Sequence, residues 1–183
     1  DSLFGKRSEV ISVVLDLPRT CGYGSFSLRD PARDQPVPVQ VVSRCPFHAV
    51  VNHAGDATAM MACDRVRLHM QADAIPPLGY ATFCLEHAPL ETGPGLVSGL
   101  NAMENEHLAV RIESDGTLTI HHKDTGAVFE GLHYFEDSGE AGHAWMHIEP
   151  AYDSTVSTAG GAARIALLEN GPLLARYQVE CIL

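Results

Sequence analysis

The residues best suited to chemistry lie in one stretch of the sequence, Tyr134–Pro150. It includes the carboxylic acids Glu136, Asp137 and Glu140, the histidines His143 and His147, and the only tryptophan of the chain, Trp145. Paired carboxylates can act as acid and base, histidines can bind a metal ion or hydroxyl groups, and an indole face can stack on a sugar ring. Chemistry on a carbohydrate is therefore the first hypothesis for this stretch.

Each of these residue types also has a structural explanation. Carboxylates a few residues apart in a loop commonly form turn networks. His143 and His147 are four residues apart, but the neighbouring sequence supplies no third ligand, so a zinc site is not predicted. Trp145 can anchor a small core or present a platform for a sugar, and both alternatives stay open. We therefore predict no catalytic residue and no metal ligand within this chain.

The elements that must position this stretch are strands. Apolar and polar residues alternate in Ile11–Leu17, Val66–Met70 and Leu108–Ile112. A period of two residues is typical of antiparallel sheets that pack one face on a core and leave the other in water. Asp115-Gly116 and Lys123–Gly126 follow such runs and supply tight turns. The sequence predicts an all-β chain.

A segment rich in proline and glycine divides the chain. We predict a linker over residues 89–99, which leaves a small β-sandwich in residues 1–88 and a second β-domain in residues 100–183. The last alternating run, 173–183, follows a turn at Glu169–Pro172 and has no polar tail. Because natural domains avoid open apolar edges, we expect the sequence to be the middle of a larger protein, cut at both ends.

Composition excludes some classes of partner. Lys and Arg number 12 against 23 Asp and Glu, a net charge of −11 that argues against binding to nucleic acid. No apolar run is long enough to span a membrane. The five cysteines lack Cys-x-x-Cys spacing. Four of them, Cys84 for example, lie among apolar or β-favouring neighbours, and we expect these to be small buried hydrophobes. With no visible signal peptide, the prediction is a reducing, cytoplasmic location.

A series of short motifs adds a family resemblance. Six motifs stand in one order across roughly residues 9 to 180: Pro38–Val41, Ile75–Phe83, Met103–Val110, Asp115–Leu118, Lys123–Gly126 and Phe135–Trp145. The first two resemble strands of the small β-sandwich of family 38 glycoside hydrolases, the retaining α-mannosidases. The next three resemble the start of that family's large β-domain, and the last resembles its Asp- and Gly-rich loop.

The resemblance implies a multi-domain enzyme that cleaves α-mannosides through a covalent glycosyl intermediate, using a carboxylate nucleophile and a zinc ion. In this family those groups lie in an N-terminal α/β domain, so the zinc ligands would lie outside this chain. The implied partners are that missing catalytic domain, a remaining C-terminal β-domain and the α-mannoside. Residues 100–183 would then be the first part of a galactose-mutarotase-like supersandwich.

The resemblance also assigns two substrate-binding residues. Trp145 stands where the family often has a tyrosine that reaches the sugar, and His143 stands where it often has aspartate. An indole stacks and donates through its N–H but lacks the phenol oxygen.

Three hypotheses follow. The first is a non-catalytic fragment of such a mannosidase, contributing at most one loop to the substrate. The alternative is a stand-alone carbohydrate-binding β-sandwich, and the third is a structural or interaction module, favoured if Trp145 is buried.

Overall fold

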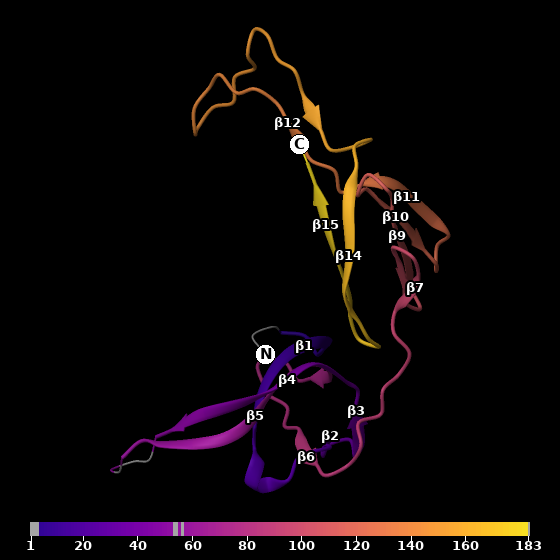
Figure 1. Ribbon diagram of the computed structural model, residues 1–183. Helices are drawn as coiled ribbons and strands as arrows, with labels where there is room; N and C mark the ends of the chain where they lie inside the picture. Colours follow the sequence, from indigo (N-terminus) through magenta and orange to yellow (C-terminus); the bar gives the residue numbers. More distant parts are fainter. Residues whose placement is uncertain (1–3, 53–54, 56, 183) are drawn as a thin grey trace. The chain divides into compact units, whose positions relative to one another are not determined.

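The computed structural model describes residues 4–52, 55 and 57–182, and it confirms the all-β prediction. Figure 1 shows the strands as arrows, coloured along the sequence from the N-terminus (indigo) to the C-terminus (yellow). Among the described residues the only helical element is the short 3-10 turn η1 (Arg19–Cys21), and no helix is long and apolar enough to cross a membrane. The chain divides into unit 1, Asp1–Gly95 with Gly171–Leu174, and unit 2, Leu96–Asn170 with Ala175–Leu183.

Unit 1 contains two antiparallel sheets of three strands. The first has the order β1-β5-β4, formed by β1 (Arg7–Pro18), β5 (Ala59–Ile75) and β4 (Val39–Val51). The second has the order β3-β2-β6, formed by β3 (Gln35–Val37), β2 (Ser27–Asp30) and β6 (Cys84–Glu86). Pairing of β1 with β5 ends at Pro18 and Cys63, whereas β4 stays paired with β5 as far as Val51 and Ala59. The β4–β5 pair therefore continues as a two-stranded ribbon (Figure 1).

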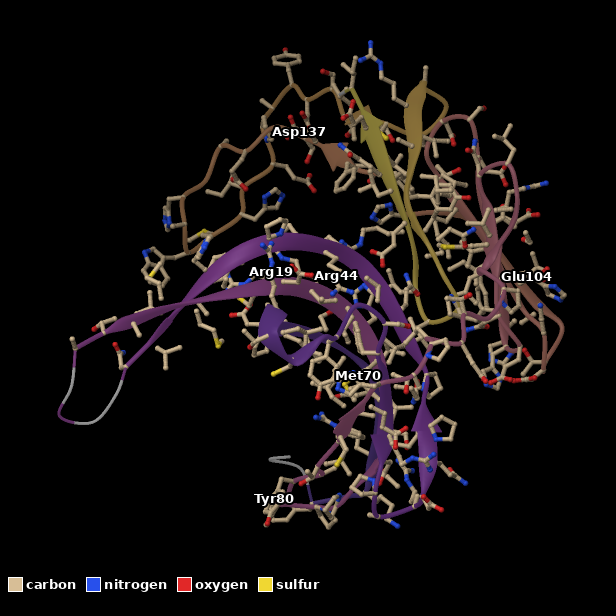
Figure 2. The ribbon with its side chains drawn as sticks, turned by 60° about the horizontal axis from the view of Figure 1, so that its bottom comes forward. Arg19, Arg44, Met70, Tyr80, Glu104 and Asp137 are labelled. Carbon is tan, nitrogen blue, oxygen red and sulfur yellow. The ribbon has the colours of Figure 1, made fainter. Side chains whose placement is uncertain are left out.

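Side chains from both sheets of unit 1 form one core. Its buried members are Leu17, Phe26, Leu28, Val37, Val39, Val66, Leu68 and Met70. The predicted alternation explains the members that come from the central strand β5, because Val66, Leu68 and Met70 are every second residue of that strand. Met70, labelled in Figure 2, is 4% exposed, and Leu68 is 1% exposed. The small β-sandwich expected in the first part of the chain is confirmed.

Unit 2 is built from three further antiparallel sheets. The largest has the order β11-β10-β9-β8-β7, formed by β7 (Val97–Gly99), β8 (Ala102–Glu104), β9 (Leu108–Ile112), β10 (Leu118–His122) and β11 (Ala127–Leu132). Two-stranded sheets are formed by β12 (Glu136–Asp137) with β13 (Val156–Ser157), and by β14 (Ala163–Asn170) with β15 (Ala175–Cys181).

The predicted turns of unit 2 are confirmed. Gly116 joins β9 to β10 with φ 88°, and Gly126 joins β10 to β11 with φ 72°, values that favour glycine because it has no Cβ. The β9–β10 turn also packs on the β14–β15 hairpin. A Cβ on Gly116 would lie 2.8 Å from Sγ of Cys181 and 2.9 Å from Cγ1 of Val179. Gly116 is therefore required by both its backbone angle and its packing.

Unit 2 buries little apolar surface of its own. Among the described residues, Ile112 is its single buried apolar side chain, whereas the other buried apolar residues belong to unit 1. Large apolar residues of its strands, such as Phe129 and Leu168, are more than half exposed. The expected supersandwich stays a prediction, since these sheets form only a partial core.

Two details differ from expectation. The units divide after Gly95, inside the predicted linker 89–99, but residues 97–99 already form the strand β7. The prediction that Cys84 is buried is wrong: alternation in β6 turns Leu85 toward the core and Cys84 outward. Cys63 alone among the described cysteines is buried.

Candidate functional site

The chemistry-bearing stretch forms a long loop between β12 and β13 of unit 2. The base of this loop is closed by two hydrogen bonds: the Phe135 amide donates to Oγ1 of Thr158, and the Thr158 amide donates to the Phe135 carbonyl, both at 3.0 Å. Thr158 is 4% exposed, so the base is firmly anchored. Figure 1 shows the loop as a long excursion between these strands, and Figure 2 labels Asp137 at its start.

Residues 141–148 form a small hairpin within the loop, called here the 141–148 hairpin. The Ala141 amide donates to the Ile148 carbonyl at 2.9 Å. His143 and Met146 exchange two backbone hydrogen bonds, of 3.0 and 2.9 Å. Ala144 and Trp145 are therefore the two residues of the turn. This geometry places Trp145 at the tip.

The Glu140 carboxylate lies at the base of the 141–148 hairpin and bonds to both of its strands. Its Oε1 accepts the amides of Gly142 at 2.5 Å and Ile148 at 2.9 Å, and its Oε2 bonds to Nδ1 of His147. The Ile148 amide, followed by His147 and the Gly142 amide, lowers the pKa of Glu140 to about 2. Glu140 is therefore ionised at neutral pH and cannot serve there as a proton donor.

The two histidines of the loop have different partners. Because an ionised carboxylate only accepts hydrogen bonds, Nδ1 of His147 carries the hydrogen in its bond to Glu140. Nδ1 of His143 instead accepts the amide of Trp145 at 3.3 Å, which leaves the hydrogen of a neutral ring on Nε2. The spacing of four residues thus does not bring the two rings to one ligand. Among the described residues, no group of three or more His, Cys, Asp or Glu is placed to hold a metal ion.

Two aromatic side chains of the loop lie almost entirely in solvent. Trp145 is 92% exposed, so it is not a core residue of this structure. Tyr152 is 97% exposed and was missed by sequence reasoning. Its only signal was an aromatic residue in a polar segment without strand alternation. The loop therefore offers two aromatic faces, the indole N–H and Nε2 of the exposed His143, groups that can contact a polyol.

A hollow of unit 1 contains another charged cluster. The Asp64 carboxylate accepts hydrogen bonds from Arg19 at 3.0 Å and from Arg44 at 2.8 Å, and these guanidinium groups lower the pKa of Asp64. Arg44 also donates to the carbonyls of Tyr23 and Gly24, and Figure 2 shows Arg19 and Arg44 side by side. The cluster fastens the segment after β1 to β4 and β5, so its role is structural.

Comparisons with solved structures identify the fold. An α-mannosidase from Enterococcus faecalis V583 superimposes with a TM-score of 0.76 at 24% identity, over 98% of this chain. A glycosyl hydrolase family 38 protein from Enterococcus faecalis superimposes with a TM-score of 0.75 at 24% identity, also over 98% of this chain. The fold is that of a segment of a family 38 glycosyl hydrolase. The resemblance predicted from the motifs is thereby confirmed at the level of fold.

The likeness covers only part of each relative. The chain spans 22% and 23% of the two solved chains. In sequence it is 30% identical over 80 residues to a putative mannosylglycerate hydrolase of Halalkalibacterium halodurans, which is 44% of this chain and 9% of that protein. No protein-family model matches the sequence.

Proposed function

We propose that the chain is the central β-region of a retaining α-mannosidase of the family 38 type. In this proposal the chain is not catalytic by itself and contributes one loop to the substrate side of the active site. The observation that carries the proposal is the superposition of 98% of the chain on 22% of an α-mannosidase structure. A match that extends across both units supports a continuous segment of such an enzyme rather than one shared small domain.

The surface of unit 2 supports a role inside a larger protein. Exposed apolar residues in its strands include Val128, Phe129, Leu132, Leu167 and Leu168. Extensive exposed apolar surface is typical of an interface, because its removal from water is favourable. In the proposed enzyme, the remaining β-domain and the catalytic domain would cover this surface.

The tip of the 141–148 hairpin would be the point of contact with the α-mannoside. The Trp145 indole can stack on the apolar face of a sugar ring, and Nε2 of His143 can donate to a hydroxyl. Trp145 lies in the two-residue turn and His143 directly precedes that turn, so a single hexose could contact both side chains. A contact worth about 0.5–1.5 kcal/mol corresponds to roughly a 2- to 10-fold effect on kcat/KM.

The zinc ion and the nucleophile of the proposed reaction are assigned to the domain outside this sequence. The described residues do not fit a zinc site, because no three potential ligands converge. Glu140 also does not fit the role of nucleophile or acid, since both of its oxygens are hydrogen-bonded within the loop. We therefore derive no chemical step from this chain.

The experiment compares the 183-residue chain with the longer protein translated from the native reading frame. We expect 4-nitrophenyl α-mannoside to be hydrolysed by the longer protein and not by the chain. Hydrolysis by the chain alone would refute its non-catalytic role. A native reading frame that lacks an upstream α/β domain with His-x-Asp zinc ligands would refute the assignment to this enzyme class.

A stand-alone carbohydrate-binding module is the second candidate function. The observation that favours it is the exposure of Trp145 and Tyr152 in one loop. Isothermal titration of the chain with millimolar mannose discriminates between the two. Heat of binding that disappears in Trp145→Ala supports the module, and the absence of heat favours the enzyme fragment.

A further inference from the structure

The 141–148 hairpin lacks the apolar support that usually stabilises a two-stranded structure. An isolated hairpin is marginal in water unless one face packs on a core. Here the side chains that could supply packing are exposed: Trp145 by 92%, Met146 by 55% and Ile148 by 46%. Three backbone hydrogen bonds between solvated strands contribute little net stability. Another interaction must hold the tip in place.

The Glu140 carboxylate supplies that interaction. It accepts one amide from each strand of the hairpin, Gly142 at 2.5 Å and Ile148 at 2.9 Å, and it also binds His147. Hydrogen bonds to an ionised acceptor are roughly twice as strong as those between neutral groups. A single side chain therefore connects both ends of the hairpin.

The close approach of Glu140 depends on a glycine. A Cβ on Gly142 would lie 2.7 Å from Oε1 of Glu140 and 2.0 Å from the Met146 carbonyl oxygen. Any side chain at position 142 would push apart the two strands of the hairpin, whose Gly142 and Ile148 amides the carboxylate brings together. Closure of the hairpin thus needs both residues: Glu140 makes the hydrogen bonds, and Gly142 leaves room for them.

We propose that Glu140 is a positioning residue whose carboxylate holds the 141–148 hairpin closed and thereby fixes the orientation of the Trp145 indole. An effect of Glu140 on sugar binding rests on the proposed function, whereas its role in closing the hairpin does not. Glu140 acts through Trp145 and makes no contact with substrate itself.

The chain carries its own probe for this proposal, because Trp145 is the only tryptophan. Its time-resolved fluorescence anisotropy reports nanosecond motion of the tip alone. In Glu140→Ala we expect the amplitude of the fast local decay to rise about twofold, because the bonds to both strands are lost. The emission maximum should hardly move, since the indole is already exposed.

A matched control and a rescue separate closure from loss of charge. Glu149 is exposed in the same loop, so Glu149→Ala removes the same charge and should leave the anisotropy unchanged. Glu140→Gln keeps an oxygen that can accept both amides but lacks the charge, so its anisotropy should lie between those of the parent chain and of Glu140→Ala. Gly142→Ala opens the same closure without removing the carboxylate and should resemble Glu140→Ala. An anisotropy decay in Glu140→Ala equal to that of Glu149→Ala would overturn the proposal.

A second measurement distinguishes failure of this proposal from failure of the proposed function. In the longer enzyme, Glu140→Ala and Trp145→Ala should each lower kcat/KM, and the double variant should be no worse than Trp145→Ala alone, because both act through one indole. Additive losses would overturn the positioning role. If tip motion increases in Glu140→Ala but kcat/KM is unchanged in Trp145→Ala, the role of Glu140 in hairpin closure is supported and the sugar contact is refuted.

Discussion

Replacement of Trp145 by alanine should separate a surface aromatic from a core aromatic. The side chain is 92% exposed, so only about 8% of its surface is covered. A tryptophan presents up to roughly 250 Å², which makes the covered area about 20 Å². At ~25 cal/mol per Å², Trp145→Ala should lower the free energy of unfolding by no more than about 0.5 kcal/mol. A loss of that size corresponds to a fall in Tm of roughly 2–4 °C for a unit of this length.

The assay is thermal unfolding of the 183-residue chain followed by far-ultraviolet circular dichroism, because the variant has no tryptophan left for fluorescence. Tyr152→Ala is a matched control, since that aromatic residue of the same loop is 97% exposed. Both variants should melt within a few degrees of the parent chain. A destabilisation of about 3 kcal/mol or more in Trp145→Ala would show a packed side chain, as is typical of large-to-small changes in a core. That result would refute the assignment of the indole to a binding surface.

Three further predictions concern packing, a turn and pH. Leu68→Ala should destabilise unit 1 by about 2–5 kcal/mol in denaturant unfolding, because Leu68 is 1% exposed on the central strand β5. A loss of less than about 1 kcal/mol would contradict the observed core. Gly116→Ala should lower the free energy of unfolding of unit 2 by about 1–3 kcal/mol, because of its φ of 88° and the clash of the new Cβ with Cys181. Gly126→Ala, where nothing lies within 4 Å of the new Cβ, should lower it less, and equal losses would refute the packing argument. The pKa of Glu140 is lowered from 4.5 to about 2, so the part of hairpin closure that depends on its charge should be complete above pH 4.5 and be lost as the pH falls toward 2. Trp145 anisotropy in the parent chain should then approach that of Glu140→Gln, which should show no such transition.

The turns were predictable because their chemistry is local. Gly116 and Gly126 adopt positive φ values that residues with a Cβ rarely accept, and each follows an alternating run of apolar residues. β1 and β5 could each be predicted as strands, but not as partners, since they are far apart in the sequence. Cys84 was misplaced because apolar neighbours do not reveal which face of a short strand is covered.

The candidate site was predictable as a segment but not as an arrangement. The types of Trp145, His143 and Glu140 indicated carbohydrate chemistry, and their spacing could not show that Glu140 would bond to His147 across a turn. The spacing of His143 and His147 did not indicate their partners, and the hairpin gives the two rings different ones. Hydrogen bonds between residues on opposite strands depend on register, which short loop segments do not specify.

What the sequence by itself determined is the β architecture, its turns and the stretch that carries the functional side chains. Those features follow from side-chain alternation and glycine stereochemistry, which act over a few residues. What only the tertiary structure decided is that Trp145 is exposed at a tip and that Glu140 closes the hairpin beneath it. Burial and long-range hydrogen bonding depend on which surfaces meet in three dimensions, and no local pattern contains that information.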